Sequence, residues 1–560
     1  MPLATIPLVG SPLKRGLDVI NYLTKDRTYS GVLIDVIPDS ITKSLTVYLQ
    51  KRPGFKTGST ISSGQGGSAI CDIYGFINDV WTGPCTAFFS GTPTTTVKFF
   101  IGTTQIGTES TTLRSSVHIT KAIVNAEETF LLTLNSAGES GWFIGTTGMT
   151  GGLTFTANTN TSVTLSNVSS FTGLVIGQKL TGTDIPSTAR IQSMDTAAAT
   201  VTMTSAATGT TAGITVTREQ ISRIISSNFP SIATGPMQEM DGFVFAADGA
   251  NKRIYQSALN DISTWSASNY LTVDTRGDFL GISKYKNYIV SHCSDGFNFY
   301  KNVGNRSGSV LSMDSTLSKK IGSLVRSGGV GSLAGIRSVP FSIVDDNLVI
   351  GYSGLFLIND TGTKKISDGV VDRLLTNQSI STLIINAFSM LGKYYVLVTN
   401  TLATFSFIYD MQNNIWTQSG FSVCPFISKH LGETIYFNSA SLHYLPWSGA
   451  AQTPAFQDDG VNFTVTVQTE NLYLNDGDGF TLNNIDLIAD NQTSGTVTLE
   501  ISRDDYATWT TYGTYDLTLT KKRITSSILC DTLVAFRMTY ADNTDFRAQA
   551  LKVKYTRANV

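Results

Sequence analysis

The residue types that could support catalysis or hold a metal ion are few and scattered along this 560-residue chain. The four histidines are His118, His292, His430 and His443. No two of them have a metal-ligand spacing on one element, and no cysteine accompanies one in a zinc-binding pattern. His292 and Cys293 are neighbours in an expected strand, so their side chains should point to opposite faces of the sheet. The sequence therefore predicts no catalytic residue, no metal ligand and no cofactor-binding residue.

The cysteines do not suggest a disulfide framework or a redox motif. They are odd in number, widely spaced and without a C-x-x-C pair: Cys71, Cys85, Cys293, Cys424 and Cys530. A disulfide scaffold would show an even, clustered set. We expect them to be small core residues of a protein made in a reducing cytosol.

Two further segments contain residue types that could bind a ligand. The glycine-rich run Gly322–Gly335 lacks the lysine of a phosphate-binding loop and opens no helical pattern, so it is predicted to be a flexible loop. Asp476 and Asp478, in the phrase LNDGDGF, could offer oxygen ligands to calcium. The run lacks the further acids and the terminal glutamate of an EF-hand loop, so a solvated turn is favoured. Whether a metal ion binds near Asp476 stays open.

The segment Ser502–Trp509, SRDDYATW, is similar to the Asp-box turn of sialidase-like propellers, S-x-D-x-G-x-T-W. Tyr506 replaces the glycine, and the box occurs once. In such a turn the aspartate and serine stabilise a hairpin while the tryptophan packs beneath it. A sialidase would also need several boxes, an arginine triad and a Tyr–Glu pair, so the segment indicates a folding device. It keeps a glycan-binding or sialidase-like propeller open as an alternative.

The composition is that of a β-rich, turn-rich protein. Charged residues make up 15% of the chain, against roughly 25% in typical soluble domains. Forty basic and 42 acidic residues give a net charge of −2, which argues against tight binding to DNA phosphates. The basic pairs, such as Lys51-Arg52, are scattered and are expected to be solvated. We expect no signal peptide and no membrane span.

One hairpin pattern recurs between about residues 240 and 445. The marker residues Phe243, Tyr288, Leu348, Tyr395 and Ile435 are 45, 60, 47 and 40 residues apart. Such spacing, with several short strands in each period, is typical of propeller blades. The segment before residue 140 also contains strands and would supply a first blade. We predict a β-propeller, with six blades as the expected number; a series of β-sandwiches is the alternative.

Two composition shifts divide the chain further. Residues 146–217 are rich in Thr, Gly, Ser and Ala, which indicates an inserted small β-domain. From about residue 455, apolar and polar residues alternate with period two, as in half-buried antiparallel strands. The predicted fold is all-β. Its sections are an N-terminal segment with the first propeller strands (1–145), the insertion (146–217), the blades (218–450), and a C-terminal β-sandwich section or closing blades (451–560).

Several phrases, in their order along the chain, resemble one family. They are KDRTYSGVLIDVI and YLQKRPGF near the N-terminus, Met240–Leu271, SHCSDGFNFYKN, IGYSGLFLIND, Phe407–Gln418 and a terminal portion that includes EISRDDYATW. The family comprises the tail nozzle proteins of short-tailed bacteriophages, also called tail tubular protein B or packaged-DNA stabilisation proteins. The resemblance covers roughly residues 10–140 and 218–560 and leaves out the insertion.

The resemblance implies a virion structural protein that is not an enzyme. Six copies would form a homohexameric ring below the head-to-tail adaptor protein, with genomic DNA passing through the lumen and tail fibre or tip proteins outside. The ring would retain packaged DNA and pass it at infection. The protein would be located at the virion tail tip after assembly in the host cytoplasm. The alternatives are a glycan-binding or sialidase-like propeller and a tail fibre or adhesin; lumen-lining and gate residues stay unassigned.

Overall fold

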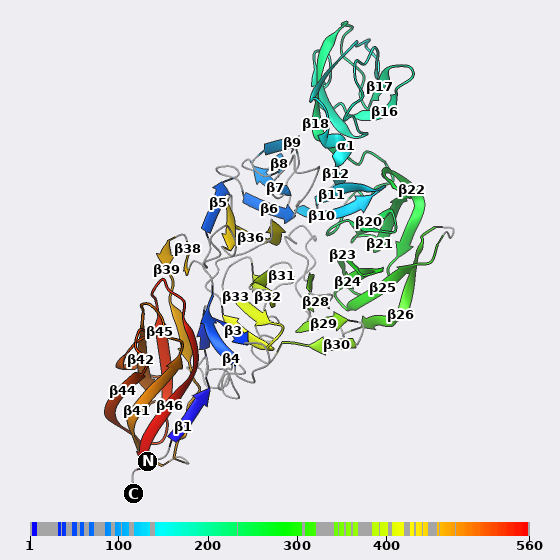
Figure 1. Ribbon diagram of the computed structural model, residues 1–560. Helices are drawn as coiled ribbons and strands as arrows, with labels where there is room; N and C mark the ends of the chain where they lie inside the picture. The colour runs from blue at the N-terminus through cyan, green and yellow to red at the C-terminus, as the bar shows by residue number, and fades with distance from the viewer. Residues whose placement is uncertain are drawn as a thin grey trace.

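The computed structural model is an all-β protein (Figure 1), which confirms the fold class predicted from the sequence. Within the described part of the chain, the one helix is α1 (Thr146–Met149). The structure describes residues 3–7, 32–34, 36–40, 47–52, 56–60, 66–71, 85–90, 96–101, 104–110, 117–134, 141–231, 233–304, 308–320, 341–344, 347–351, 354–359, 362–367, 383–390, 393–400, 406–418, 426–430, 433–438, 441–445, 456–458, 460–475 and 478–557.

Among the described strands, seven four-stranded antiparallel units, here called blades 1 to 7, form a β-propeller. Blade 1 contains β6 (Gly66–Cys71), β7 (Cys85–Ser90), β8 (Thr96–Ile101) and β9 (Thr104–Ser110). Blade 2 contains β10 (Val117–Val124), β11 (Glu127–Leu134), β12 (Gly141–Gly145) and β18 (Ile214–Arg223). Blade 3 contains β19 (Gln238–Met240), β20 (Phe243–Asp248), β21 (Arg253–Ala258) and β22 (Asp261–Thr272). Blade 4 contains β23 (Phe279–Tyr285), β24 (Tyr288–Cys293), β25 (Gly296–Asn302) and β26 (Leu311–Lys320).

The remaining blades come from the middle of the chain and one N-terminal strand. Blade 5 contains β27 (Phe341–Val344), β28 (Asn347–Gly351), β29 (Leu355–Asn359) and β30 (Gly362–Lys365). Blade 6 contains β31 (Leu383–Met390), β32 (Lys393–Asn400), β33 (Ser406–Asp410) and β34 (Ile415–Gln418). Blade 7 contains β35 (Phe426–His430), β36 (Glu433–Asn438), β37 (Ser441–Leu445) and β5 (Lys56–Thr60).

The blades close into a ring. The first strands of successive blades contact one another from β6 to β10, β19 and β23, then from β27 to β31, β35 and back to β6. Blades 4 and 5 meet where Ile358 packs into a core with Tyr285 and Phe299. The N-terminal strand β5 pairs antiparallel with β37, so segments far apart in sequence complete blade 7. A closed ring of this kind leaves only short sheet edges exposed.

The sequence-based expectation of six blades is corrected to seven four-stranded units among the described strands. The spacing of hairpins reveals five blades after residue 240 and one before residue 140. Blade 2 is not visible in that spacing because the insertion separates its third strand, β12, from its fourth, β18. A periodic pattern cannot be followed across such an interruption.

The β-sandwich is built from both ends of the chain. One sheet has the order β3 (Val36–Ser40), β4 (Val47–Lys51), β46 (Arg547–Arg557), β41 (Phe480–Ala489) and β44 (Lys522–Cys530), with β1 (Leu3–Pro7) also paired to β46. The other has the order β2 (Val32–Ile34), β40 (Val465–Gln468), β45 (Ala535–Tyr540), β42 (Thr496–Ser502) and β43 (Thr510–Asp516). A short hairpin, β38 (Gln457–Asp458) and β39 (Val461–Asn462), precedes β40. Buried side chains from both sheets, among them Leu49, Phe480 and Phe536, form one core.

The inserted domain has its own apolar core. Its strands are β13 (Thr154–Ala157), β14 (Thr164–Leu165), β15 (Gln178–Gly182), β16 (Ile191–Asp195) and β17 (Thr200–Met203), together with the first part of β18. Leu165, Leu180, Ile191 and Val201 are fully buried there. Many hydroxyl-bearing residues alternate with these, as expected for strands that bury one face.

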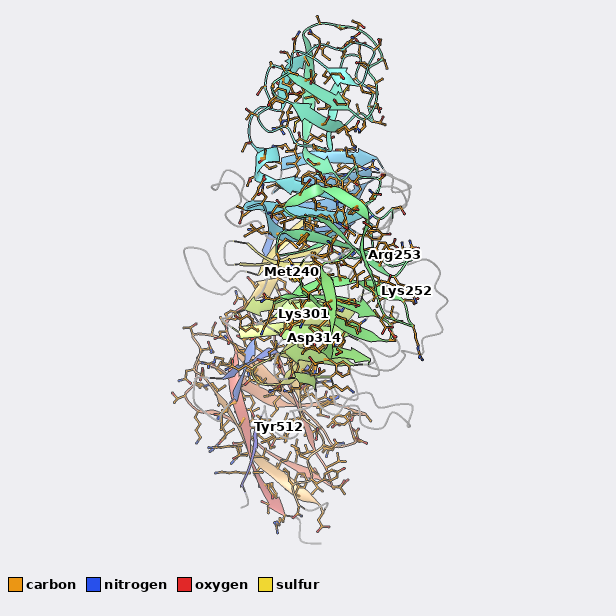
Figure 2. The ribbon with its side chains drawn as sticks, turned by 90° about the vertical axis from the view of Figure 1, so that its right-hand side faces the viewer. Met240, Lys252, Arg253, Lys301, Asp314 and Tyr512 are labelled. Carbon is orange, nitrogen blue, oxygen red and sulfur yellow. The ribbon has the colours of Figure 1, made fainter. Side chains whose placement is uncertain are left out.

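Both appended bodies share sheets with the propeller. The last strand of blade 6, β34, pairs parallel with β2, so that blade and one sandwich sheet form a single nine-stranded sheet. At the other joint, β18 pairs with β13 and β15 of the insertion and, at its end, with β12 of blade 2. The insertion, the propeller and the sandwich lie in this order along the molecule (Figures 1 and 2), with both chain ends on the sandwich.

Candidate functional site

The structure places the four histidines in three blades. His118 is buried in β10, and burial lowers the pKa of its imidazole to about 4. His292 is buried in β24, where its Nε2 lies 2.8 Å from the Ser283 Oγ, and burial lowers its pKa to about 3. His430 and His443 belong to β35 and β37 of blade 7. Both buried imidazoles favour their neutral form.

The cysteines are likewise separated, with one exception. Cys293 and Cys530 are buried free thiols, and burial raises the pKa of each to about 11. Such thiols are poor nucleophiles. Cys71 and Cys85 are opposite partners in the register of β6 and β7, a proximity that their sequence spacing did not reveal. Cys424 lies outside the described residues.

The two possible ligand-binding segments lie largely outside the described residues. Among the described residues, no group of three or more His, Cys, Asp or Glu side chains could hold a metal ion. Asp476 and the run Gly322–Gly335 lie outside the described residues. Asp478 is in a turn, where its backbone N–H donates to the Asn475 carbonyl. In the same part of the chain, no helix combines the length and hydropathy that a membrane span needs.

The Asp-box-like turn has the geometry expected of a folding device. Asp504 accepts hydrogen bonds from the hydroxyl of Ser502 (2.8 Å) and the backbone N–H of Thr508 (2.9 Å), and from the Thr508 hydroxyl. Hydrogen bonds from Thr508 lower the pKa of Asp504 to about 2. The turn joins β42 to β43 and therefore lies in the sandwich, outside the propeller. It does not mark a sialidase-type blade.

Lys51 and Arg52 were expected to be solvated, and that expectation is wrong. Both are buried. The Arg52 guanidinium donates to both carboxylate oxygens of Asp458, at 2.9 and 2.6 Å, and lies 3.8 Å over the Phe463 ring. The Lys51 ammonium donates to the Asp542 carbonyl at 2.6 Å. This pair ties the N-terminal strand β4 to the C-terminal part of the sandwich.

The joint between the insertion and blade 2 is organised by Arg218 in β18. Its guanidinium donates to three backbone carbonyls, at Gly148 (2.7 Å), Thr150 (2.6 Å) and Gly152 (3.2 Å). The side chain is 2% exposed, and burial lowers its pKa. One cation thus satisfies the carbonyls of a turn that has little regular structure of its own.

Backbone contacts complete the joint at Gly177. Its N–H donates to the Ile191 carbonyl (2.8 Å), and its carbonyl accepts from the Arg223 N–H (3.0 Å). Gly177 has a φ of +90°, and a Cβ there would lie 1.9 Å from the Arg223 carbonyl oxygen. Glycine is required at this crossing for both reasons. Gln178 beside it is buried and bonds to backbone groups of Gly173 and Val175.

Two clefts flank this joint. The first, the acidic cleft, has a volume of about 310 Å³ and lies between the insertion and blades 2 and 3. It carries two carboxylates, Glu127 and Asp261, beside Asn125 and Asn260, over an apolar floor that includes Phe143. Carboxylates and amides over an apolar surface are groups that bind sugar hydroxyls.

Both carboxylates of the acidic cleft also hold local backbone structure. Glu127 accepts a hydrogen bond from the backbone N–H of Thr147, at the start of α1. Asp261 accepts from the backbone N–H and the hydroxyl of Ser263, at 2.8 and 2.6 Å. Burial raises the pKa of Asp261, but the hydrogen bonds from Ser263 and Thr264 outweigh it and leave the pKa below its ordinary value. Asp261 is therefore an ionised acceptor at neutral pH.

The second, the basic cleft, has a volume of about 380 Å³. It is lined by Arg190 of the insertion and Arg223 at the end of β18, with hydroxyl groups around them. Among its described lining residues there is no carboxylate. The two clefts thus present opposite charges at one joint, and neither was predicted from the sequence, because their residues come from segments that only the fold brings together.

Comparison with known proteins adds few constraints. No family model and no curated protein matches the sequence. Solved structures with a similar arrangement include the N-terminal domain of Nup159 (7% identity, 74% of this chain and 98% of that one, TM-score 0.33). An exo-β-1,3-galactanase from Phanerochaete chrysosporium also matches, with 11% identity over 57% of this chain and 95% of that one and a TM-score of 0.21. A Trypanosoma rangeli sialidase matches with 9% identity over 94% of each chain and a TM-score of 0.23. At such low sequence identity and TM-score, the activity of a matched protein cannot be assigned to this chain.

The prediction that the chain is not an enzyme is contradicted, since a galactanase and a sialidase are among these matches. That prediction rested on the lack of contiguous catalytic motifs. In a propeller, functional side chains come from loops of different blades, so a missing motif does not exclude catalysis. What stands is the coarser statement that the chain is a β-propeller protein with two appended β-domains.

Proposed function

We propose that this chain is a structural subunit of the tail nozzle of a short-tailed phage. The observation that supports it most is the joining of insertion, propeller and sandwich through shared sheets. Flexible linkers would let the three bodies move independently, whereas paired strands carry force from one to the next. A continuous β-framework suits a subunit that keeps a conduit in shape against packaged DNA.

In this proposal six copies form a ring below the head-to-tail adaptor, at the virion tail tip, after assembly in the host cytoplasm. Genomic DNA passes through the lumen, and tail fibre or tip proteins attach outside. The net charge of −2 suits a conduit, because strong phosphate binding would hold back moving DNA. The insertion projects from the propeller at the end away from the sandwich (Figure 1), where it is free to contact a neighbouring protein.

One phrase of the family resemblance coincides with a structural joint. Lys51–Phe55 contains Arg52, whose ion pair with Asp458 ties the end of β4 to the C-terminal part of the sandwich. Beyond Phe55 the chain continues into β5, which closes the propeller ring. The phrase therefore lies where the two bodies are linked, as expected of a framework subunit.

The test is imaging of the purified protein and of virions. Electron microscopy should show closed rings with six-fold symmetry, and mass spectrometry should find the chain in purified particles. Arg52→Ala should reduce ring yield, whereas Lys521→Ala, which removes an exposed charge, should not. A protein that stays monomeric at all concentrations and is missing from virions would refute the proposal.

A glycan-binding or glycan-cleaving propeller is the second candidate, favoured by the acidic cleft. Glu127 and Asp261 face one cavity of a size that holds a sugar. Carboxylate pairs are the groups from which glycosidases build their acid, base or nucleophile. In this candidate the cleft binds a neutral saccharide, and Asp261 acts as the ionised member of the pair.

Glycan arrays and hydrolysis assays would test this candidate. Binding or turnover should be lost in Glu127→Gln and Asp261→Asn and kept in Glu128→Gln, which changes a neighbouring carboxylate paired with Lys121. Retention of binding or turnover in both cleft variants would assign it to another surface. If no glycan binds or turns over, the candidate is rejected and the nozzle proposal is unaffected.

A further inference from the structure

The basic cleft is lined by two arginine residues from different parts of the fold. Arg190 directly precedes β16 of the insertion, and Arg223 is the last residue of β18. Arg190 is 6% exposed, and its Nη1 donates to the Gly177 carbonyl at 3.2 Å. The backbone N–H of Arg223 donates to the same carbonyl. The Gly177 carbonyl thus links the Arg190 side chain to the Arg223 backbone.

Hydroxyl groups surround the two arginines. Thr188, Thr204, Ser227 and Ser231 line the cavity and are exposed to solvent. A hydroxyl group both donates and accepts hydrogen bonds, so this rim matches the hydroxyls of a polyol. The wall is completed by Phe229 and Pro230, which offer an apolar surface.

We propose that the basic cleft is a binding site for an anionic saccharide, with Arg190 and Arg223 holding a phosphate or carboxylate group. Arginine binds such oxyanions in planar, two-point geometry, and its guanidinium loses less hydration than an ammonium would. The volume of about 380 Å³ lies at the lower end of small-ligand sites, which suits one or two sugar rings. The proposal does not depend on the nozzle role or on activity in the acidic cleft.

The charges around the joint support this ligand class. The acidic cleft places Glu127 and Asp261 on its own side of the joint, where an anion would be repelled. Among the described residues that line the basic cleft there is no carboxylate to compete with a ligand oxyanion. Arg190 is buried, and the low dielectric around a buried guanidinium strengthens its attraction for an anion.

Isothermal titration of the full-length protein would test the site, with glucose 6-phosphate, glucuronate, inorganic phosphate and glucose as probes. Glucose 6-phosphate or glucuronate should bind saturably, inorganic phosphate more weakly, and glucose not at all. Arg223→Met should weaken binding by roughly ten- to a hundredfold, as expected for one lost charge-assisted hydrogen bond. Arg276→Met, which removes an exposed arginine elsewhere, should bind as the unmodified protein does.

Because Arg223→Met could disturb β18, a second variant tests the site without changing that strand. Ser227→Ala combined with Thr188→Ala alters only exposed hydroxyls and should weaken sugar phosphate binding by several-fold while leaving phosphate binding unchanged. Equal affinity for phosphate and sugar phosphate would overturn the saccharide assignment. No saturable binding of any anion, or binding that survives in Arg223→Met, would overturn the site itself.

Discussion

The inserted domain and the C-terminal sandwich are both joined to the propeller by shared sheets, but the two joints are built differently. The insertion leaves blade 2 after β12 and returns along β18, and Arg218 locks it by donating to backbone carbonyls. The sandwich combines strands from both chain ends, and Arg52 locks it through the carboxylate of Asp458, 406 residues away. The insertion can fold from a local segment, whereas the sandwich forms only once the whole chain is available.

The largest effect on stability should come from a substitution at Gly177, where two backbone segments cross in the insertion joint. Gly177→Ala places a Cβ 1.9 Å from the Arg223 carbonyl oxygen and holds alanine at φ +90°. We expect a loss of more than about 4 kcal/mol in the unfolding free energy of the insertion, because the clash is with backbone. Limited proteolysis within 146–223 and thermal unfolding would measure it.

Gly213→Ala is the matched control for this change. Gly213 also has a positive φ, of +64°, but a Cβ added there would meet no atom within 4 Å. Only the left-handed backbone opposes alanine there, at a cost of about 1–2 kcal/mol. If the two variants were equally stable, the crossing at Gly177 would not be the feature that fixes the joint.

Removal of the Arg218 guanidinium should have the next largest effect. Arg218→Met keeps the length of the side chain but leaves the carbonyls of Gly148, Thr150 and Gly152 without their donor. We expect a loss of about 3 kcal/mol, because the buried Gly148 carbonyl and the two partly buried carbonyls all lose their charged donor. Hydrogen exchange should rise in residues 146–153, and the exposed Arg276→Met should cause no such rise. Unchanged exchange there would contradict the locking role of Arg218.

The sandwich joint should respond to the Arg52–Asp458 pair. Arg52 is 2% and Asp458 19% exposed at the side chain, and the contact is bidentate. A double-mutant cycle with Arg52→Met and Asp458→Asn should give a coupling energy of about 2 kcal/mol from urea unfolding of the sandwich. Proteolysis of the insertion should be unaffected. Strictly additive effects would show that the pair does not couple the two chain ends.

The sequence predicted the fold class well because its signals are local. Alternating apolar residues and regular hairpins predict strands and blades without knowledge of what packs against them. The contribution of β1–β4 to the sandwich left no such signal, because β4 pairs with β46 across about the whole chain. Blade 2 was missed for a related reason, since β12 and β18 are adjacent in space and separated by the insertion.

The clefts could not be predicted for the same physical reason. Glu127 and Asp261 each follow a tight hairpin turn in different blades, and nothing near either residue signals the other. Arg190 and Arg223 line one cleft only because Gly177 lets two backbone segments cross closely. Lys51 and Arg52 resembled a solvated pair because their partners, the Asp542 carbonyl and the Asp458 carboxylate, lie at the other end of the chain.

Low pH should destabilise the propeller more than the two appended domains. All four histidines lie in propeller strands, and residues 146–213 and 457–557 contain none. Burial holds the pKa of His118 at about 4 and that of His292 at about 3, below the ordinary 6.5. The folded state therefore disfavours the charged imidazole. This stability is fully present above pH 6.5 and is lost as the pH falls from 6.5 toward the folded-state pKa values, because the unfolded chain takes up the protons.

The expected loss is about 2 kcal/mol per buried histidine at pH 5, which lies above the ordinary carboxylate range. Hydrogen exchange at pH 7 and pH 5 would measure it by region: propeller peptides should lose protection while those of the insertion and the sandwich keep theirs. His292→Gln should flatten the pH dependence of blade 4, because glutamine can still bond to Ser283 and has no proton to take up. An equal loss of protection in the insertion, the propeller and the sandwich would mean that the shared sheets make all three unfold as one unit. The difference between the two joints would then affect only how the chain folds, and would not affect the stability of each body.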